Sequence, residues 1–80
     1  MQILESTLRT LAAAGSVREL SAKRVKSGDA WAWVLLVRIE LLEAPLEKQR
    51  GGVREFKSLD AVATLVDSLG VRELVVKLSN

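Results

Sequence analysis

Residues 30–42, AWAWVLLVRIELL, decide the fold of this chain. Tryptophan, valine and isoleucine favour extended backbone, so the stretch predicts a β-strand. Side chains alternate between the two faces of a strand, and here both faces are apolar for most of the length. One face carries Trp31, Trp33, Leu35, Val37, Ile39 and Leu41, and the other carries Ala30, Ala32, Val34, Leu36 and Leu42. Such a strand needs a cover on each side.

The segments before and after this strand complete a β-hairpin and a loop. Leucines at helical spacing, followed by Gly15, predict a helix over residues 2–14. Residues 17–26 alternate without a helical period, and the turn signal Ser27-Gly28-Asp29 joins them to residues 30–42 as a β-hairpin. Glu43 to Gly52 carries the single proline, several charges and a pair of glycines, which predicts a mobile loop.

The C-terminal part predicts a strand, a helix and a strand. Residues 53–57 form the first strand, and Ser58 is a good N-cap for a helix whose apolar stripe runs from Leu59 to Leu69. Gly70 closes that helix, and residues 71–78 form the last strand. We therefore expect an α+β fold with the order α-β-β-β-α-β. Two helices and a small mixed or antiparallel four-stranded sheet form a single domain over residues 1–80.

A four-residue theme recurs along the chain. Val17-Arg18-Glu19-Leu20 reappears as Val53-Arg54-Glu55-Phe56 and as Val71-Arg72-Glu73-Leu74. One interpretation is strand patterning, in which arginine and glutamate pair across neighbouring strands. The other is the duplication of a helix–strand unit. Patterning is favoured, because four-residue matches arise easily in a strand-rich chain.

The doubly apolar strand also predicts a homodimer. A chain of 80 residues buries only about 60–65% of its unfolded surface, so its own core is marginal. The sequence contains neither cysteine nor histidine, which excludes disulfides and ordinary zinc sites as a remedy. Two short helices cover one face of the sheet, and a second copy of the chain is the simplest cover for the other. The expected interface residues are Ala32, Val34 and Leu36.

The composition argues against an enzyme and a membrane protein. Without histidine or cysteine, acid–base chemistry would fall to carboxylates such as Glu40 and Glu43, which have no partner acid or metal motif. We expect no catalysis, no cofactor, no metal and no small-molecule substrate. Glu5 argues against a signal peptide, and the longest apolar run, residues 30–37, is too short to span a bilayer. A cytoplasmic protein is expected.

Basic residues gather in two places. One cluster, on the first arm of the hairpin, is Arg18, Lys23, Arg24 and Lys26, and the other, around the glycine pair, is Lys48, Arg50, Arg54 and Lys57. Such patches bind duplex DNA through counterion release, and a two-stranded ribbon can enter a major groove. The alternative is a solvated surface that keeps the protein soluble. Lys23 faces opposite to Arg24 and Lys26, so only part of the arm shares one face.

The two tryptophans allow two interpretations. Exposed aromatic side chains stack on bases in proteins that bind single-stranded nucleic acid. Trp31 and Trp33, however, share a face with Leu35 and Val37, which favours packing in the core or in an interface.

From Gln49 onward the chain resembles a known family. Gln49-Arg50-Gly51-Gly52, a strand ending in Phe56, Ser58-Leu59-Asp60-Ala61, a helix closing on Leu69-Gly70 and a final strand follow one another. This succession is similar to ParC-like, partition-associated proteins carried on bacterial plasmids and integrated elements. The resemblance implies a plasmid or mobile-element accessory protein with a DNA-binding or regulatory role. It carries over no catalytic residue.

Two functional hypotheses follow. The first is a homodimeric DNA-binding accessory or regulatory protein of a plasmid or mobile element, without a membrane partner. The alternative is a non-catalytic protein–protein adaptor whose apolar strand docks a partner. The hairpin separates the two hypotheses, because binding DNA requires Lys23, Arg24 and Lys26 to point outward together.

Overall fold

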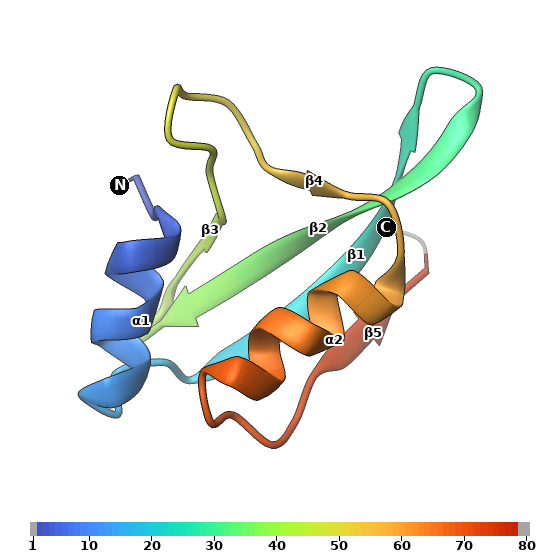
Figure 1. The fold of residues 1–80 in the computed structure, drawn as a ribbon. Coiled ribbons are helices and arrows are strands. Elements are labelled where there is room, and N and C mark those ends of the chain that lie inside the picture. Colours follow the sequence, from blue (N-terminus) through green and yellow to red (C-terminus); the bar gives the residue numbers. More distant parts are fainter. Residues whose placement is uncertain (1, 79–80) are drawn as a thin grey trace.

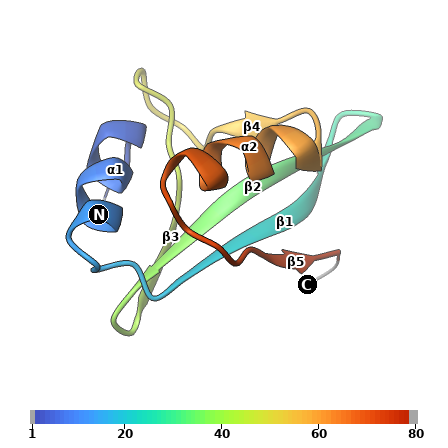
Figure 2. The same ribbon diagram turned by 60° about the horizontal axis from the view of Figure 1, so that its bottom comes forward.

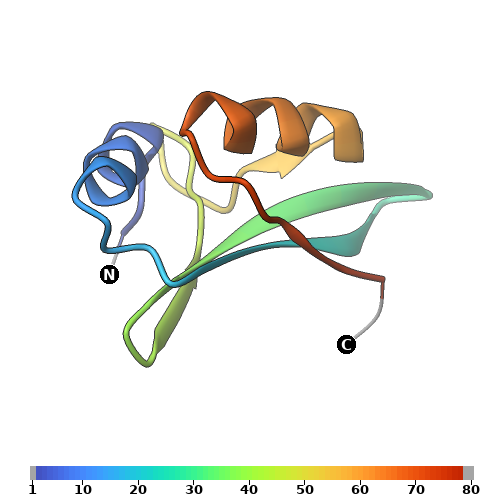
Figure 3. The ribbon, with the colours of Figure 1, turned by 90° about the horizontal axis from the view of Figure 1, so that it is seen from below.

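The computed structural model describes residues 2–78 and confirms the α+β fold class. Two helices, α1 (Glu5–Ala13) and α2 (Leu59–Ser68), lie on one face of a mixed sheet (Figures 1 and 3). The strands are β1 (Glu19–Ser27), β2 (Ala30–Ile39), β3 (Leu42–Pro45), β4 (Glu55–Phe56) and β5 (Val75–Lys77). The order is therefore α-β-β-β-β-α-β, with five strands where four were predicted.

Strand β2 lies in the middle of the sheet and has neighbours on both edges. It pairs antiparallel with β1 along the whole length of β1, which confirms the predicted hairpin. Gly28 forms the turn with a φ of 63°, a conformation that favours glycine. On its other edge β2 pairs antiparallel with both β3 and β4. Strand β5 pairs in parallel with β1 and forms the outer edge of the sheet.

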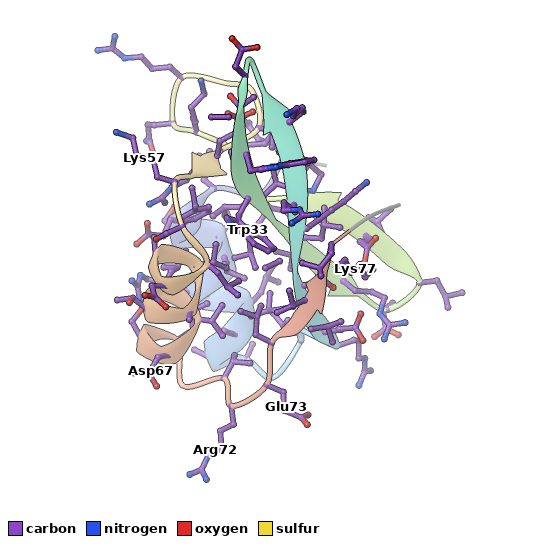
Figure 4. All side chains as sticks on the ribbon, turned by 90° about the vertical axis from the view of Figure 1, so that its right-hand side faces the viewer. Trp33, Lys57, Asp67, Arg72, Glu73 and Lys77 are labelled. Atoms are coloured by element: carbon purple, nitrogen blue, oxygen red, sulfur yellow. The ribbon has the colours of Figure 1, made fainter. Side chains whose placement is uncertain are left out.

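The helices cover the odd-numbered face of β2. Leu35 and Val37 are fully buried there, in one core with Leu8 of α1 and Val62 of α2. Trp33 packs against the same core and lies between α2 and the sheet in Figure 4. The even-numbered face points away from the helices, and no helix of the described chain lies on that side in Figure 3.

The two helices begin for different reasons. Ser58 caps α2, since its side chain accepts a hydrogen bond from the Ala61 N–H at 3.1 Å, as the sequence predicts. Helix α1 is shorter than the predicted span of residues 2–14. The residues before Glu5 that were predicted to be helical pair with another segment instead. Ile3 forms a β-bridge with Leu46, and the Ile3 carbonyl accepts a hydrogen bond from the Glu47 N–H at 2.7 Å.

The first residues of the segment from Glu43 to Gly52 belong to the sheet, which corrects the start of the predicted loop; Lys48 to Gly52 form a turn, and their mobility stays a prediction. Strand β3 pairs with β2 up to Pro45, and the Leu46 N–H then donates to the Leu35 carbonyl at 2.8 Å. Pairing along the same edge resumes where Glu55 lies opposite Val34. Strands β3 and β4 are thus one edge strand, interrupted by an excursion of residues 47–54.

The base of this excursion is closed by backbone hydrogen bonds. The Arg54 N–H donates to the Leu46 carbonyl at 2.9 Å, and the Lys48 N–H donates to the Gly52 carbonyl at 2.9 Å. Gly51 and Gly52 have positive φ values of 91° and 84°, so the glycine pair forms a tight turn. The proline that suggested a loop lies in an edge strand, where a missing N–H is tolerated.

Two strands are shorter than predicted. Strand β2 stops at Ile39, because Glu40 adopts a φ of 56° and starts a turn in which Leu41 is fully exposed. In the last strand only Val75–Lys77 pairs with β1. Residues 71–74 are separated from residues 17–20 by a groove of about 540 Å³.

The walls of this groove are two copies of the recurring motif. Val17–Leu20 lines one side and Val71–Leu74 the other. Each residue of Val71–Leu74 follows its counterpart in Val17–Leu20 by the same number of positions as Val75 follows its pairing partner Ser21. The two motifs therefore lie side by side, in register, on parallel segments. Each parallel strand also follows a helix along the chain. Duplication of a helix–strand unit nevertheless stays a hypothesis.

Within residues 2–78, neither helix is long and apolar enough to cross a membrane.

The buried Leu46 provides a test of the edge strand formed by β3 and β4. Leu46 has no exposed surface, whereas Leu41 is completely exposed. We expect Leu46→Ala to lower the free energy of unfolding by about 2–5 kcal/mol, because it leaves a cavity in the core. The matched change Leu41→Ala should alter it by less than about 0.5 kcal/mol. Urea denaturation measures both, and equal effects would contradict the placement of Leu46.

Candidate nucleic-acid interface

The β1–β2 hairpin extends beyond both helices, so its tip is free of the core (Figures 1 and 2). Trp31 lies in this outer part and exposes 53% of its surface. Trp33, two residues further along, is half-buried against the core. Core packing therefore holds for Trp33 and is wrong for Trp31, because the helices end before they reach the tip; packing of Trp31 in an interface stays a prediction.

Two basic side chains of β1 surround Trp31. Lys26 lies directly opposite Trp31 in the hairpin register, and Arg24 lies diagonally across from it. The Lys26 Nζ is 4.5 Å from the centre of the indole ring, and the Arg24 Cζ is 4.4 Å from it. These are cation–π distances, so the ring fixes both charges on one face of the tip.

The Arg24 guanidinium still has an unused donor. Its Nε is buried and has no hydrogen-bond partner among the described residues. The side chain as a whole is only half-buried.

Lys23 lies on the opposite face of the hairpin. It is paired with Val34, whose side chain points away from the helices. The predicted alternation is thus confirmed, and Lys23 does not share a face with Arg24 and Lys26. The three basic side chains therefore do not point outward together, and only Arg24 and Lys26 meet the criterion set for DNA binding.

Two of the predicted DNA-binding residues are engaged in ion pairs. Arg18 contacts Glu40 at 3.2 Å and lies at the inner end of β1, a whole strand length away from the tip. Arg54 contacts Glu5 at 2.8 Å, and its guanidinium lies 4.7 Å from the centre of the Phe56 ring. The structure therefore does not bring Arg18 together with the hairpin tip, and it uses Arg54 to hold α1 against the excursion.

The basic residues without an ion-pair partner gather at one end of the molecule. Within residues 2–78 they are Lys23, Arg24, Lys26, Lys48, Arg50, Lys57 and Arg72. All except Arg72 belong to the hairpin arm, the excursion or the segment after β4, which form the upper end in Figures 1 and 4. Asp29, Glu47 and Glu55 are acidic residues in this region.

A pocket connects the hairpin tip with the segment after β4. Its volume is about 480 Å³, and Trp31, Phe56 and Lys57 line it. Glu55 also lines it and accepts a hydrogen bond from the Ser27 hydroxyl at 2.9 Å. Lys57, which belongs to the second basic cluster of the sequence, therefore shares a surface with Trp31.

The predicted interface residues lie on the sheet face away from the helices. Ala32 and Val34 each expose only 7% of their surface, and Leu36 is half-buried. Side chains of the chain itself cover part of this sheet face. The Lys77 Nζ of β5 reaches across β1 and β2 to within 4.0 Å of a Glu43 oxygen in β3. Their role in a dimer stays a prediction.

Comparison with known proteins places this fold in a family. A family model described as ParC-like matches residues 3–80. The chain belongs to the ParC-like family. The resemblance noted from Gln49 onward is thus confirmed, and it extends over the N-terminal half of this ParC-like chain. No curated protein and no solved structure matches the sequence.

The Glu5 carboxylate makes the stability of this ParC-like chain depend on pH. Hydrogen bonds from Arg54 and then from Arg9 hold the pKa of Glu5 below its ordinary value. A lowered pKa in the folded state stabilises the protein above the unfolded pKa, and this contribution is lost as the pH falls through the folded pKa.

We therefore expect Glu5→Gln to lower the free energy of unfolding at pH 7 by about 1 kcal/mol or less, because the pair is partly exposed. The difference from wild type should disappear at acidic pH. Urea denaturation across a pH series measures it, and a difference that persists below the folded pKa would contradict the assigned cause.

The two tryptophans should differ in fluorescence. The variant Trp33→Phe keeps only the exposed Trp31, and the variant Trp31→Phe keeps only the half-buried Trp33. The emission of Trp33→Phe should therefore be red-shifted relative to that of Trp31→Phe and several-fold more sensitive to quenching by acrylamide. Similar quenching in both variants would place Trp31 in the core after all.

Proposed function

We propose that this ParC-like chain is a homodimeric, non-enzymatic DNA-binding accessory or regulatory protein of a plasmid or other mobile element. One observation carries the proposal. Arg24 and Lys26 stand together beside the exposed Trp31 on a projecting hairpin, and neither has an ion-pair partner within the described chain. Membership of the ParC-like family supports a plasmid- or partition-related role.

The distribution of ion pairs explains why the hairpin is the contact surface. A basic side chain that already faces a carboxylate, such as Arg18 or Arg54, offers little net charge to a phosphate. Arg24, Lys26 and Lys57 offer their full charge. When they contact phosphates, the counterions condensed on the DNA are released, and this release favours binding. Binding through these residues is driven by the DNA backbone, which positions the protein without selecting a sequence.

The hairpin shape suits this role. A two-stranded ribbon fits the major groove of B-DNA, and the tip of this hairpin extends past the helices that would otherwise block its approach (Figure 2). The indole of Trp31 keeps the flexible side chains of Arg24 and Lys26 at the tip. A homodimer presents two such arms and so doubles the number of phosphate contacts.

The salt dependence of DNA binding tests the proposal. If Arg24, Lys26 and Lys57 of both protomers contact phosphates, log affinity for duplex DNA should fall with log salt at a slope of about −5. The double variant Arg24→Ala, Lys26→Ala should flatten this slope by about 3–4 and weaken binding to every sequence. Mobility shifts or fluorescence anisotropy over a salt series measure both values.

The control removes the same number of charges elsewhere. Arg9→Ala with Arg18→Ala removes two ion-paired arginines and should leave the slope close to that of wild type. If the control flattens the slope as much as the hairpin variant, net charge and not the arm drives binding. A wild-type protein that retards no DNA at about 50 mM salt would refute the proposal and favour the protein–protein adaptor.

A further inference from the structure

Strand β5 is an unpaired edge with exposed apolar side chains. It is the last strand of the sheet and pairs only with β1 within the described chain. Val75, Val76 and Leu78 expose 41%, 43% and 56% of their surface. Helix α2 packs over β1, β2 and β4, so Val76 lies beyond its cover, and Val75 points to the opposite face of the sheet. Unpaired backbone groups along such an edge are a template for another strand.

We propose that the second copy in the homodimer joins this edge, so that β5 pairs antiparallel with β5 of its twin across a twofold axis at Val75. The two sheets then continue as one. The inference rests on the homodimer of the proposed function and names its interface.

Symmetry restricts the possible registers. A twofold axis between antiparallel strands stands perpendicular to the sheet and keeps each face on its own side. Opposed residues must share a face, so residue numbers in an opposed pair are both odd or both even. An axis at Arg72 would set two arginines against each other, and an axis at Glu73 would set two glutamates against each other.

The axis at Val75 is the register that pairs opposite charges. Glu73 then lies opposite the partner's Lys77, and the same contact recurs on the other side of the axis. Lys77 belongs to the face away from the helices, since Val75 and Lys77 pair with Ser21 and Lys23 on that face, and the proposed pairing extends the same alternation back to Glu73. The two charge pairs flank a contact between Val75 and its twin.

Both side chains are available for this contact. Glu73 is exposed and forms no ion pair within residues 2–78. Lys77 contacts Glu43 at 4.0 Å, the longest of the ion pairs in the described chain. It can therefore turn towards a closer carboxylate.

The other face of the strand pair is apolar. In the same register Leu74 lies opposite the partner's Val76, on the face that carries the helices. This contact covers surface that α2 leaves open. By contrast, Ala32 and Val34 expose only 7% each, so burying them in a dimer removes little further apolar surface from water. The β5 edge is thus the better interface than the predicted face of β2.

Charge reversal tests the interface by light scattering and sedimentation. Wild type should have twice the 8.8 kDa chain mass at micromolar concentration. Glu73→Lys or Lys77→Glu alone replaces both attractions by repulsions and should raise the dimer Kd on the order of 10- to 100-fold. Mixing the two variants should produce a heterodimer, because every opposed pair is then of opposite charge. The double variant Glu73→Lys, Lys77→Glu should dimerise like wild type.

An exposed acidic residue of α2 provides the matched control. Asp67 is exposed and forms no ion pair within residues 2–78, so Asp67→Lys makes the same charge change away from the β5 edge and should leave the mass unchanged. Circular dichroism checks that each variant is folded. A wild-type monomer, single variants that remain dimeric, or a mixture that stays monomeric would each overturn the proposed interface. DNA binding is measured separately. If the Glu73→Lys variant is monomeric and still retards DNA through Arg24 and Lys26, the proposed dimer interface and the proposed DNA-binding surface are independent, and both proposals hold.

Discussion

Hydrogen bonding along both edges of β2 is the constraint on which the rest of the structure depends. One edge aligns β1 and so places Leu20 and Ala22 beside Leu35 under the helices. The other edge is completed by β3, Leu46 and β4 in turn. Leu46 is the link, since its N–H bonds to β2, its carbonyl closes the excursion, and its side chain is fully buried. The whole sheet is therefore assembled around one strand.

Local patterns predict the elements that depend on local interactions. The hairpin follows from alternation and a glycine turn, and α2 follows from its apolar spacing and the Ser58 cap. The sequence could not predict β3, because its four residues become a strand only by pairing with the free edge of β2. The same holds for the start of α1, which is displaced by the bridge between Ile3 and the distant Leu46.

The candidate site divides in the same way. Alternation along β1 correctly separates Lys23 from Arg24 and Lys26, since facing is a local property of a strand. Which basic residues stay unpaired depends on contacts between remote segments, as in Arg18 with Glu40 and Arg54 with Glu5. The exposure of Trp31 is also beyond local patterns, because it depends on where the helices end over the sheet.

The two proposed surfaces are compatible within one dimer. A twofold axis at Val75 keeps both helix-bearing faces on the same side, so both pairs of Arg24 and Lys26 face the same way while the hairpins point in opposite directions. Ser21 lies beside Val75, and Lys26 is five residues further along β1. With about 3.3 Å per residue and about 4.8 Å between strands, the two Lys26 backbones lie roughly 35 Å apart. One turn of B-DNA measures about 34–36 Å, which is close to this separation. In the proposed dimer, pairing through β5 would therefore join the two proposed phosphate-binding hairpins into one bivalent surface that could contact one side of a duplex at two places.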